Sequence, residues 1–189
     1  QPDNPFTLCR YLSREQYGST PIIYGQYFDA DYSIEDDWYW APVDGKYEKV
    51  PSFGNIIYDS SDKMLFPRMW NSGSGGDDRY REFYASYMSK NAKRGDRYRK
   101  PTFMENMAFF FDYQLNWMYW RYFMWNFAGR QNDCHSPSPG EIFLGNWESG
   151  ITFIDQMRLG DQSMAPDYLK QNKGKNHYYM LPLLLGLIG

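Results

Sequence analysis

Residues 103–127 are the most aromatic part of the chain and restrict its fold more than any other stretch. Phe, Tyr, Trp and Met fill most of these positions, and neither proline nor glycine interrupts them. The pair Pro101-Thr102 suits the start of a helix, and Gly129 is well placed to end one in the left-handed conformation. We therefore predict one long helix over residues 103–127.

The polar residues of this helix fall on two lines. At about 100° per residue, Glu105, Asp112 and Asn116 share one line, and Gln114 and Arg121 lie nearly opposite. This pattern indicates a helix packed on two sides, or one at a membrane boundary beside a polar cleft. A spanning helix is disfavoured because each charged side chain costs a few kcal/mol at depth. We expect the helix to lie on the extracytoplasmic side.

The N-terminal half contains shorter elements. Strands are predicted at 46–50, 55–58 and 64–66, with a turn at 59–62, as a small antiparallel meander. Residues 21–25 resemble a buried strand, because they are short, β-branched and bounded by turn residues. Residues 29–46, rich in Asp, Tyr and Trp, show no clear period and suggest a long ordered loop.

Helices are expected elsewhere. Asn4, Pro5 and Gly18 provide the start and end signals of a helix over residues 4–18. A helix begins at Asp77 or Asp78 and continues to about residue 90. After the long helix at 103–127, a further short helix is predicted at 151–159. The glycine-rich segment 71–76 is predicted to be a flexible joint within the chain. The predicted fold class is α+β, with a small antiparallel sheet in the N-terminal half and helices in the C-terminal half. Residues 1–177 are expected to form a single domain.

Charge and composition exclude several functions. The net charge is −3, and the only basic run, residues 90–100, is interrupted by Asp96, so nucleic acid is not an expected partner. Neither Cys9 nor Cys134 has metal-ligand spacing, and a disulfide between them is left open. No metal, cofactor or catalytic residue is predicted. Aromatic residues make up 20% of the chain, which suits sugar faces, interfaces or membrane headgroups.

Other candidate sites are weaker. The two histidines, His135 and His177, are far apart in sequence and give no support to a hydrolase triad. Glu141, Glu148 and Asp155 could supply a carboxylate pair for glycoside chemistry. An acidic segment with two tryptophans could hold a cation or a sugar, although a solvated loop is the simpler interpretation. Its residues are Asp29, Asp31, Glu35, Asp36, Asp37, Trp38 and Trp40.

The last residues, 178–189, become purely apolar. A bilayer requires about 20 apolar residues, and this run has roughly half that number. Lys173, Lys175 and two tyrosines precede it, as at the interfacial flank of a membrane span. We predict that 178–189 is the truncated start of a membrane span and that the chain comes from a larger membrane protein.

The aromatic helix is followed by a polar run, W-N-F-A-G-R-Q-N-D, at residues 125–133. One interpretation is a helix end, in which Gly129 makes the turn and Arg130 favours the negative helix terminus. The other is a sugar or phosphate site, in which Arg130 binds a phosphate or carboxylate and Trp125 offers a stacking face. Residue types alone favour the helix end.

Longer stretches carry a resemblance to a known family. R-Y-F-M-W-N-F-A-G-R-Q-N-D at 121–133 and G-N-W-E-S-G-I at 145–151 are similar to a family of bacterial multi-pass membrane proteins. That family was once of unknown function and is now described as glycosyltransferase-like, related to protein O-mannosyltransferases. N-P-F-T-L-C-R-Y-L-S-R-E-Q-Y-G at 4–18, L-F-P-R-M-W at 65–70 and Y-Y-M-L-P-L-L-L-G-L-I-G at 178–189 resemble it too.

The resemblance implies a GT-C type enzyme of the inner membrane, of which this chain is a central segment on the periplasmic side. Such enzymes move a sugar from a polyprenyl-phosphate donor to a protein hydroxyl. Their acidic catalytic residue lies in the first extracytoplasmic loop, so this segment alone is expected to be inactive and to shape the substrate cleft. The implied neighbours are the remaining membrane spans and the membrane surface. The alternative is a structural or glycan-binding module. The expected substrate-binding residues are Trp125, Asn126, Arg130, Gln131, Asn132, Asp133, Asn146 and Trp147.

Overall fold

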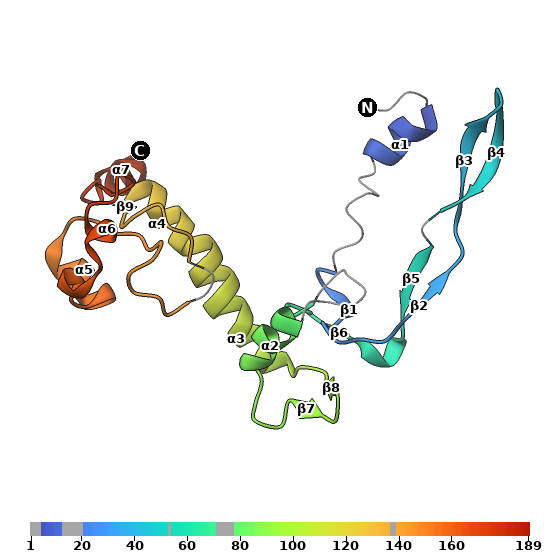
Figure 1. Ribbon diagram of the computed structural model, residues 1–189, viewed down its shortest axis with the longest axis horizontal. Helices are drawn as coiled ribbons and strands as arrows, with labels where there is room; N and C mark the ends of the chain where they lie inside the picture. Colours follow the sequence, from blue (N-terminus) through green and yellow to red (C-terminus); the bar gives the residue numbers. More distant parts are fainter. Residues whose placement is uncertain (1–4, 13–20, 53, 71–77, 137–138) are drawn as a thin grey trace. The chain divides into compact units, whose positions relative to one another are not determined.

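The computed structural model describes residues 5–12, 21–52, 54–70, 78–136 and 139–189 (Figure 1). The chain divides into two compact units, residues 1–109 and 110–189. Strands lie mainly in the N-terminal half and helices in the C-terminal half, so the predicted α+β class is confirmed. The division falls within the long helical run, and the joint predicted at 71–76 lies outside the described residues.

Six strands of unit 1 form three nested antiparallel pairs. The innermost pair joins β3 to β4, the next joins β2 to β5, and the outermost joins β1 to β6. Residues 24–65 therefore fold back on themselves as one interrupted hairpin, along which Figure 1 shows the pairs in succession. The strands are β1 (Tyr24–Gln26), β2 (Tyr32–Glu35), β3 (Trp38–Val43), β4 (Lys46–Pro51), β5 (Asn55–Tyr58) and β6 (Lys63–Leu65).

The reversal lies at Asp44-Gly45, where both residues have positive φ, 49° and 80°. A two-residue turn of this kind matches the twist of the strands that it joins, and Asp-Gly is among its preferred sequences. The loop predicted at 29–46 is therefore wrong, because most of it forms β2 and β3. The predicted meander is also wrong in its pairing, since β5 pairs with β2 and not with its sequence neighbour β6.

The strand predicted at 21–25 is shifted to Tyr24–Gln26, and only its last two residues are buried. β1 begins only at Tyr24, and Ile23 has 72% of its surface accessible. The turn predicted at 59–62 contains a short 3₁₀ helix, Ser60–Asp62, because the Asp59 carboxylate accepts a hydrogen bond from the Ser61 amide. The first helix, α1, covers Pro5–Leu12, and its predicted caps Asn4 and Gly18 lie outside the described residues.

The core of unit 1 centres on Phe109, which is only 2% exposed. Its ring packs edge-on against Phe83, Tyr84 and Tyr87, which lie on or just after α2 (Asp78–Ser86). Phe109 ends α3 (Phe103–Phe109), so these contacts join the two helices. The hairpin of β7 (Lys93–Arg94) and β8 (Arg97–Tyr98) lies between them in the chain.

Two polar residues of α3 fix the chain around this core. The buried Asn106 accepts hydrogen bonds from the amides of Arg68 and Met69 at 2.9 and 3.1 Å. Glu105 and Thr102 form a reciprocal helix cap, with Thr102 N to Oε2 at 2.7 Å and Glu105 N to the threonine hydroxyl at 3.3 Å. The predicted helix start at Pro101-Thr102 is thus confirmed.

The predicted helix over 103–127 is helical throughout but not uniform. α3 is followed by an eleven-residue π-helical segment, η3 (Phe110–Trp120), and then by α4 (Arg121–Phe127). A π-helix bonds residue i to i+5 and turns less per residue than an α-helix. The two polar lines predicted at 100° per residue are therefore wrong beyond Phe109.

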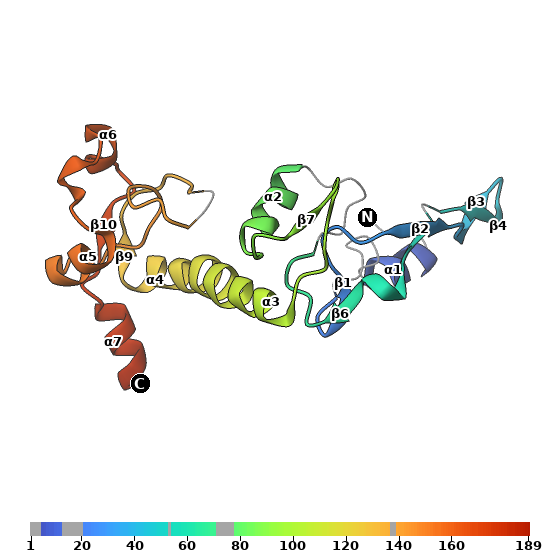
Figure 2. The same cartoon turned by 90° about the horizontal axis from the view of Figure 1, so that it is seen from below.

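Unit 2 has a small core of Met124, Ala128 and Trp147, covered by side chains that include Ile154 and Leu183. Its last helix, α7, projects from the rest of the unit (Figure 2), and five of its apolar side chains are exposed. None of the helices in the described ranges is long and apolar enough to cross a membrane. The elements after α4 are β9 (Gly129–Arg130), α5 (Thr152–Leu159), η4 (Gln162–Met164), α6 (Asp167–Lys170), β10 (Asn176–His177) and α7 (Leu181–Ile188).

Candidate substrate-binding site

The candidate site begins where α4 ends. The Ala128 amide closes the last turn onto Met124, and Gly129 follows with φ +136°. The helix therefore ends at Phe127, as predicted, but Gly129 is not the left-handed terminator that was expected, because it lies in β9 and its φ is far from the left-handed helical value of about +57°. A side chain at Gly129 would lie 2.5 Å from the carbonyl oxygens of both Glu148 and Asn176. Glycine is needed here because three backbone segments converge.

These segments place Arg130 between two neighbours. β9 pairs with β10, and Arg130 forms a bridge with Trp147 on its other side. Gln131 N donates to the Asn146 carbonyl at 3.0 Å, and Glu148 N donates to the Gly129 carbonyl at 3.0 Å. The predicted residues at 130–132 and 146–147 are therefore brought together, although the two runs are far apart in sequence.

The three amide side chains of this group are buried and hydrogen-bonded within the unit. Gln131 donates to the Ile142 carbonyl at 2.7 Å and to Gln162 at 2.6 Å. Asn132 accepts from Gly145 N at 2.9 Å and donates to the Phe143 carbonyl at 2.8 Å. Asn146 donates to the Glu141 carbonyl at 2.6 Å. These contacts give the three amides a structural role in holding loop 141–146; substrate binding by them stays a prediction.

Arg130 is different, because part of its guanidinium lacks a hydrogen-bond partner. Its Nε is buried and has none among the described residues. The guanidinium carbon lies 5.1 Å from the centre of the Trp125 ring, within cation–π range. Trp125 is held in turn by a 2.8 Å hydrogen bond from its indole nitrogen to the Asn146 carbonyl. This fixes an arginine beside an aromatic ring at the end of α4.

Arg121 lies on the same tryptophan. Its guanidinium carbon is 4.4 Å from the Trp117 ring and 5.7 Å from the Trp125 ring. The order Trp117, Arg121, Trp125, Arg130 is thus a ladder of alternating rings and cations. Burial lowers the pKa of Arg121, yet arginine stays charged at neutral pH. The ladder therefore presents two cations around one indole ring.

Trp147, the second tryptophan of the predicted substrate-binding set, has the guanidinium of Arg158 over its ring. The Arg158 guanidinium carbon is 3.9 Å from the Trp147 ring, and its NH2 group donates to the Trp147 carbonyl. Burial lowers the pKa of Arg158 to about 10, with Asp155 and Glu148 opposing that shift. Sequence reasoning missed Arg158, because only the packing of α5 places it against Trp147.

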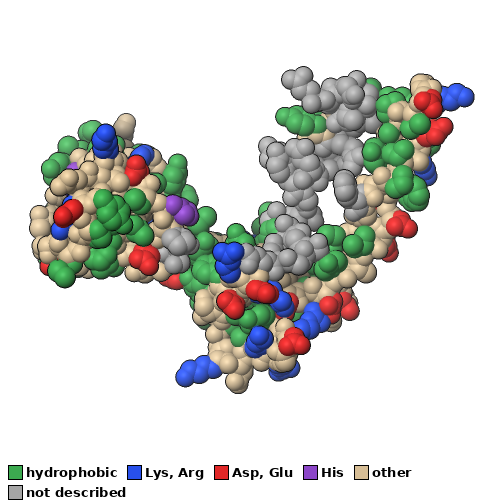
Figure 3. Space-filling model, in the orientation of Figure 1, with side chains coloured by type: hydrophobic (Ala, Val, Ile, Leu, Met, Phe, Trp, Pro, Cys, Tyr) green, Lys and Arg blue, Asp and Glu red, His purple; other side chains and the backbone are tan. Residues whose placement is uncertain are grey.

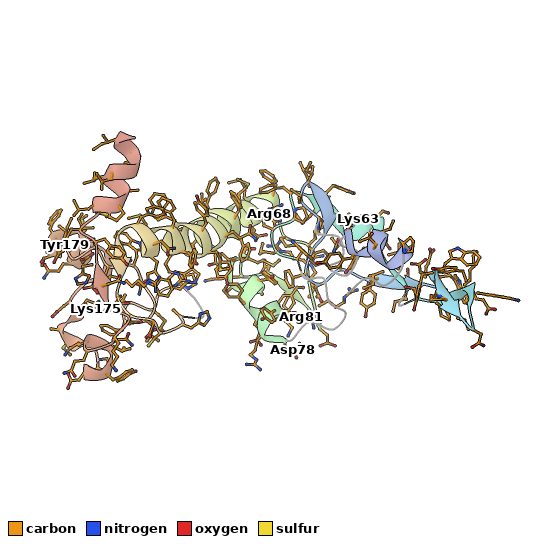
Figure 4. All side chains as sticks on the ribbon, turned by 90° about the horizontal axis from the view of Figure 1, so that it is seen from above. Lys63, Arg68, Asp78, Arg81, Lys175 and Tyr179 are labelled. Atoms are coloured by element: carbon orange, nitrogen blue, oxygen red, sulfur yellow. The ribbon has the colours of Figure 1, made fainter. Side chains whose placement is uncertain are left out.

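Glu148, next to Trp147, is a buried carboxylate at 8% exposure. Its Oε1 lies 3.1 Å from Lys175 Nζ and 3.2 Å from His177 Nε2, and its Oε2 is buried without a hydrogen-bond partner in the described chain. Figure 4 labels Lys175 in this unit. Asp155 instead accepts hydrogen bonds from Ser149 and Gly150. These contacts give both carboxylates structural partners.

The two remaining predicted residues, Asn126 and Asp133, are exposed. Asn126 donates back to the Tyr122 carbonyl at 2.8 Å, along its own helix. Asp133 lies against Gly174, where an added side chain would be 2.6 Å from its Cβ. No hydrogen bond in the described parts joins either side chain to the group around Arg130.

Two carboxylates of the acidic segment of unit 1, Asp29 and Asp31, are ion-pair partners. Asp29 accepts from Arg81 at 2.5 Å and from Tyr98 N at 2.7 Å, and Asp31 pairs with Arg97 at 2.5 Å. Figure 4 labels Arg81 beside Asp78, its other partner at 3.5 Å. Within the described ranges, no group of three or more His, Cys, Asp or Glu residues is arranged to hold a metal ion.

Comparison with known proteins adds one match. The model of a family of unknown function (DUF8416) matches residues 18–111, which include the nested strands and α3. The match ends before Trp125, so the group around Arg130 lies outside it. No curated protein and no solved structure matches the chain.

Proposed function

We propose that this chain is a periplasmic segment of a multi-pass inner-membrane glycosyltransferase that moves sugar from polyprenyl phosphate to protein hydroxyls. In this proposal Arg130 and Trp125 form one wall of the substrate cleft, and the buried Trp147 supports that wall from the core. The segment has no catalytic residue of its own, and the remaining membrane spans of the parent protein supply the chemistry.

One observation carries the proposal: the Arg130 guanidinium lies beside the Trp125 ring with Nε buried and unpaired in the described part of the chain. A guanidinium can bind phosphate oxygens through two parallel hydrogen bonds. An indole ring offers an apolar face and a polar edge, which suits the face of a sugar. A phosphate-linked sugar needs both groups close together.

The end of the chain supports a membrane setting. Tyr178 and Tyr179 are exposed, and they precede the apolar helix α7. Lys173 and Lys175 come just before them. Tyrosines and lysines next to an apolar segment are typical of the membrane–water interface. Figure 4 labels Lys175 and Tyr179 in this region.

The test is sugar transfer by membranes that contain the full-length parent protein. Arg130→Ala should reduce transfer by at least about tenfold, because one charge-assisted contact to phosphate contributes about 1.5–3 kcal/mol. Arg130→Lys should recover only part of the activity, since lysine keeps the charge but loses the fork. Arg94→Ala, in the exposed β7–β8 hairpin, is the matched control. Normal transfer by Arg130→Ala would reject the site.

A structural or glycan-binding module is the second candidate, and the buried amides favour it. Gln131, Asn132 and Asn146 all hydrogen-bond within unit 2. If the polar run serves only the fold, Arg130→Ala should lower stability by about 1 kcal/mol, as the loss of a helix cap does, and leave transfer unchanged. A melting curve of the variant, measured beside the transfer assay, separates the two functions.

A further inference from the structure

The innermost hairpin of unit 1 has two unlike faces. Side chains alternate along a strand, and directly opposite residues share a face. Trp38, Trp40 and Lys49 lie on one face, because Trp38 pairs with Pro51 and Trp40 pairs with Lys49. Tyr39 and Glu48 lie on the other. The first face, completed by Pro42, Tyr47 and Pro51, is called the tryptophan face.

The tryptophan face is accessible. Trp38 is 55% and Trp40 49% exposed, although both are large aromatic residues. Figure 3 shows hydrophobic side chains gathered along this hairpin and charged ones near its tip. Alternate residues of a strand are about 6.6–6.8 Å apart, so the two indoles stand in a row, on the scale of successive rings in an extended oligosaccharide.

A charged hydrogen-bond donor lies beside one of the two indole rings. Lys49 Nζ lies 5.8 Å from the centre of the Trp40 ring, and an ammonium offers three hydrogen-bond donors. Lys49 is the only charged residue on this face. A ligand here would meet aromatic faces for its apolar side and a donor for its hydroxyl groups. Sugars have both kinds of surface.

Charge decides between a sugar and a lipid surface. Residues 32–58 carry five acidic and two basic side chains, so this part of the interrupted hairpin has a net negative charge. Anionic lipid surfaces attract basic segments and repel acidic ones. An uncharged, hydroxyl-rich ligand is not repelled by this negative charge. The net charge of residues 32–58 therefore disfavours binding to an anionic lipid surface, which exposed tryptophans would otherwise suit.

We propose that the tryptophan face is a binding site for a neutral oligosaccharide, with Trp38 and Trp40 as stacking platforms and Lys49 as a hydroxyl-binding donor. This site lies in unit 1, away in sequence from Arg130, and it does not rest on the proposed transferase function. The chain could bind glycans here whether or not its parent protein transfers them.

The test is titration of the 189-residue chain with mannopentaose and with cellopentaose, followed by NMR of the indole N–H groups. The Trp38 and Trp40 signals should shift saturably with at least one oligosaccharide. Trp40→Ala should weaken that binding by about tenfold or more, as expected for a central aromatic contact. Trp40→Phe, which keeps a ring, should retain most of it.

Tyr39→Ala is the control, because Tyr39 lies on the same strand but on the opposite face. It should change affinity by less than about twofold, and circular dichroism should show that each variant keeps its fold. Failure of both oligosaccharides to bind would overturn the proposal, as would an equal loss in Tyr39→Ala. Trp40-dependent binding to phosphatidylglycerol vesicles, without oligosaccharide binding, would assign the face to a membrane instead.

Discussion

Glu105 provides the sharpest test of how unit 1 is held together. Its carboxylate accepts hydrogen bonds from Ser89 N at 2.8 Å, from Thr102 N at 2.7 Å, and from both terminal nitrogens of Arg99 at 2.5 and 2.9 Å. Burial alone would raise the pKa of Glu105, but Arg99 and the two amides lower it to about 2. One carboxylate thus ties the loop between α2 and α3 to the start of α3.

The expected magnitude follows from that pKa. A fall from the usual 4.5 to about 2 corresponds to about 3 kcal/mol of stability for the ionised group, and partial exposure reduces this toward about 2 kcal/mol. Because the folded pKa is the lower one, this stability is present above pH 4.5 and is lost as the pH falls toward about 2. Glu105→Gln removes the charge and also turns one acceptor into a donor facing other donors.

The assay is urea unfolding of the wild type and of Glu105→Gln between pH 7 and pH 2.5. The variant should be less stable by about 2–3 kcal/mol at pH 7, and this difference should shrink steadily below pH 4.5. Glu82→Gln, at an exposed position on α2, is the matched control and should stay within about 0.5 kcal/mol. A difference that stays the same at every pH would refute the electrostatic account of Glu105.

Two further substitutions test unit 2. Gly129→Ala should destabilise the chain by about 1–3 kcal/mol, because its new Cβ would lie 2.5 Å from two carbonyl oxygens. Gly186→Ala in α7 meets no atom within 4 Å and should be neutral or slightly stabilising; thermal melts that rank the two alike would contradict this. Glu148→Gln should cost about 1–3 kcal/mol in urea unfolding, because Lys175 and His177 lose their partner. Glu141→Gln, at an exposed position, should cost less than about 0.5 kcal/mol, and an equal loss there would reject a specific role for Glu148.

The elements that local sequence determines are the ones that sequence predicted well. The Thr102–Glu105 cap marked the start of the long helix correctly, because capping depends on residues a few positions apart. Gly129 marked its end to within two residues, but without the left-handed conformation that was expected. Asp44-Gly45 carried an equally local signal for the β3–β4 hairpin, but the surrounding Asp, Trp and Pro residues hid the strand pattern. Recognition of that dipeptide would have predicted the hairpin.

Long-range pairing could not be predicted in the same way. β2 joins β5 across the whole inner hairpin, and no local pattern distinguishes that partner from β6. The contacts of Arg158 with Trp147 and of Lys175 with Glu148 likewise depend on how separate segments pack. The π-helical segment 110–120 contains no proline or glycine, so the sequence gives no local signal for a departure from the α-helix there. These features depend on tertiary structure.

The nested strands of unit 1 also imply an order of assembly. Each pair encloses the next, so joining β1 to β6 first would close a loop of residues 27–62. Starting at Asp44-Gly45 requires only a two-residue loop, and each later pair then closes a short remaining gap. Short closures cost little chain entropy and are fast. Strand pairing can therefore start at the Asp44-Gly45 turn and proceed outward, from β3–β4 to β2–β5 and then to β1–β6.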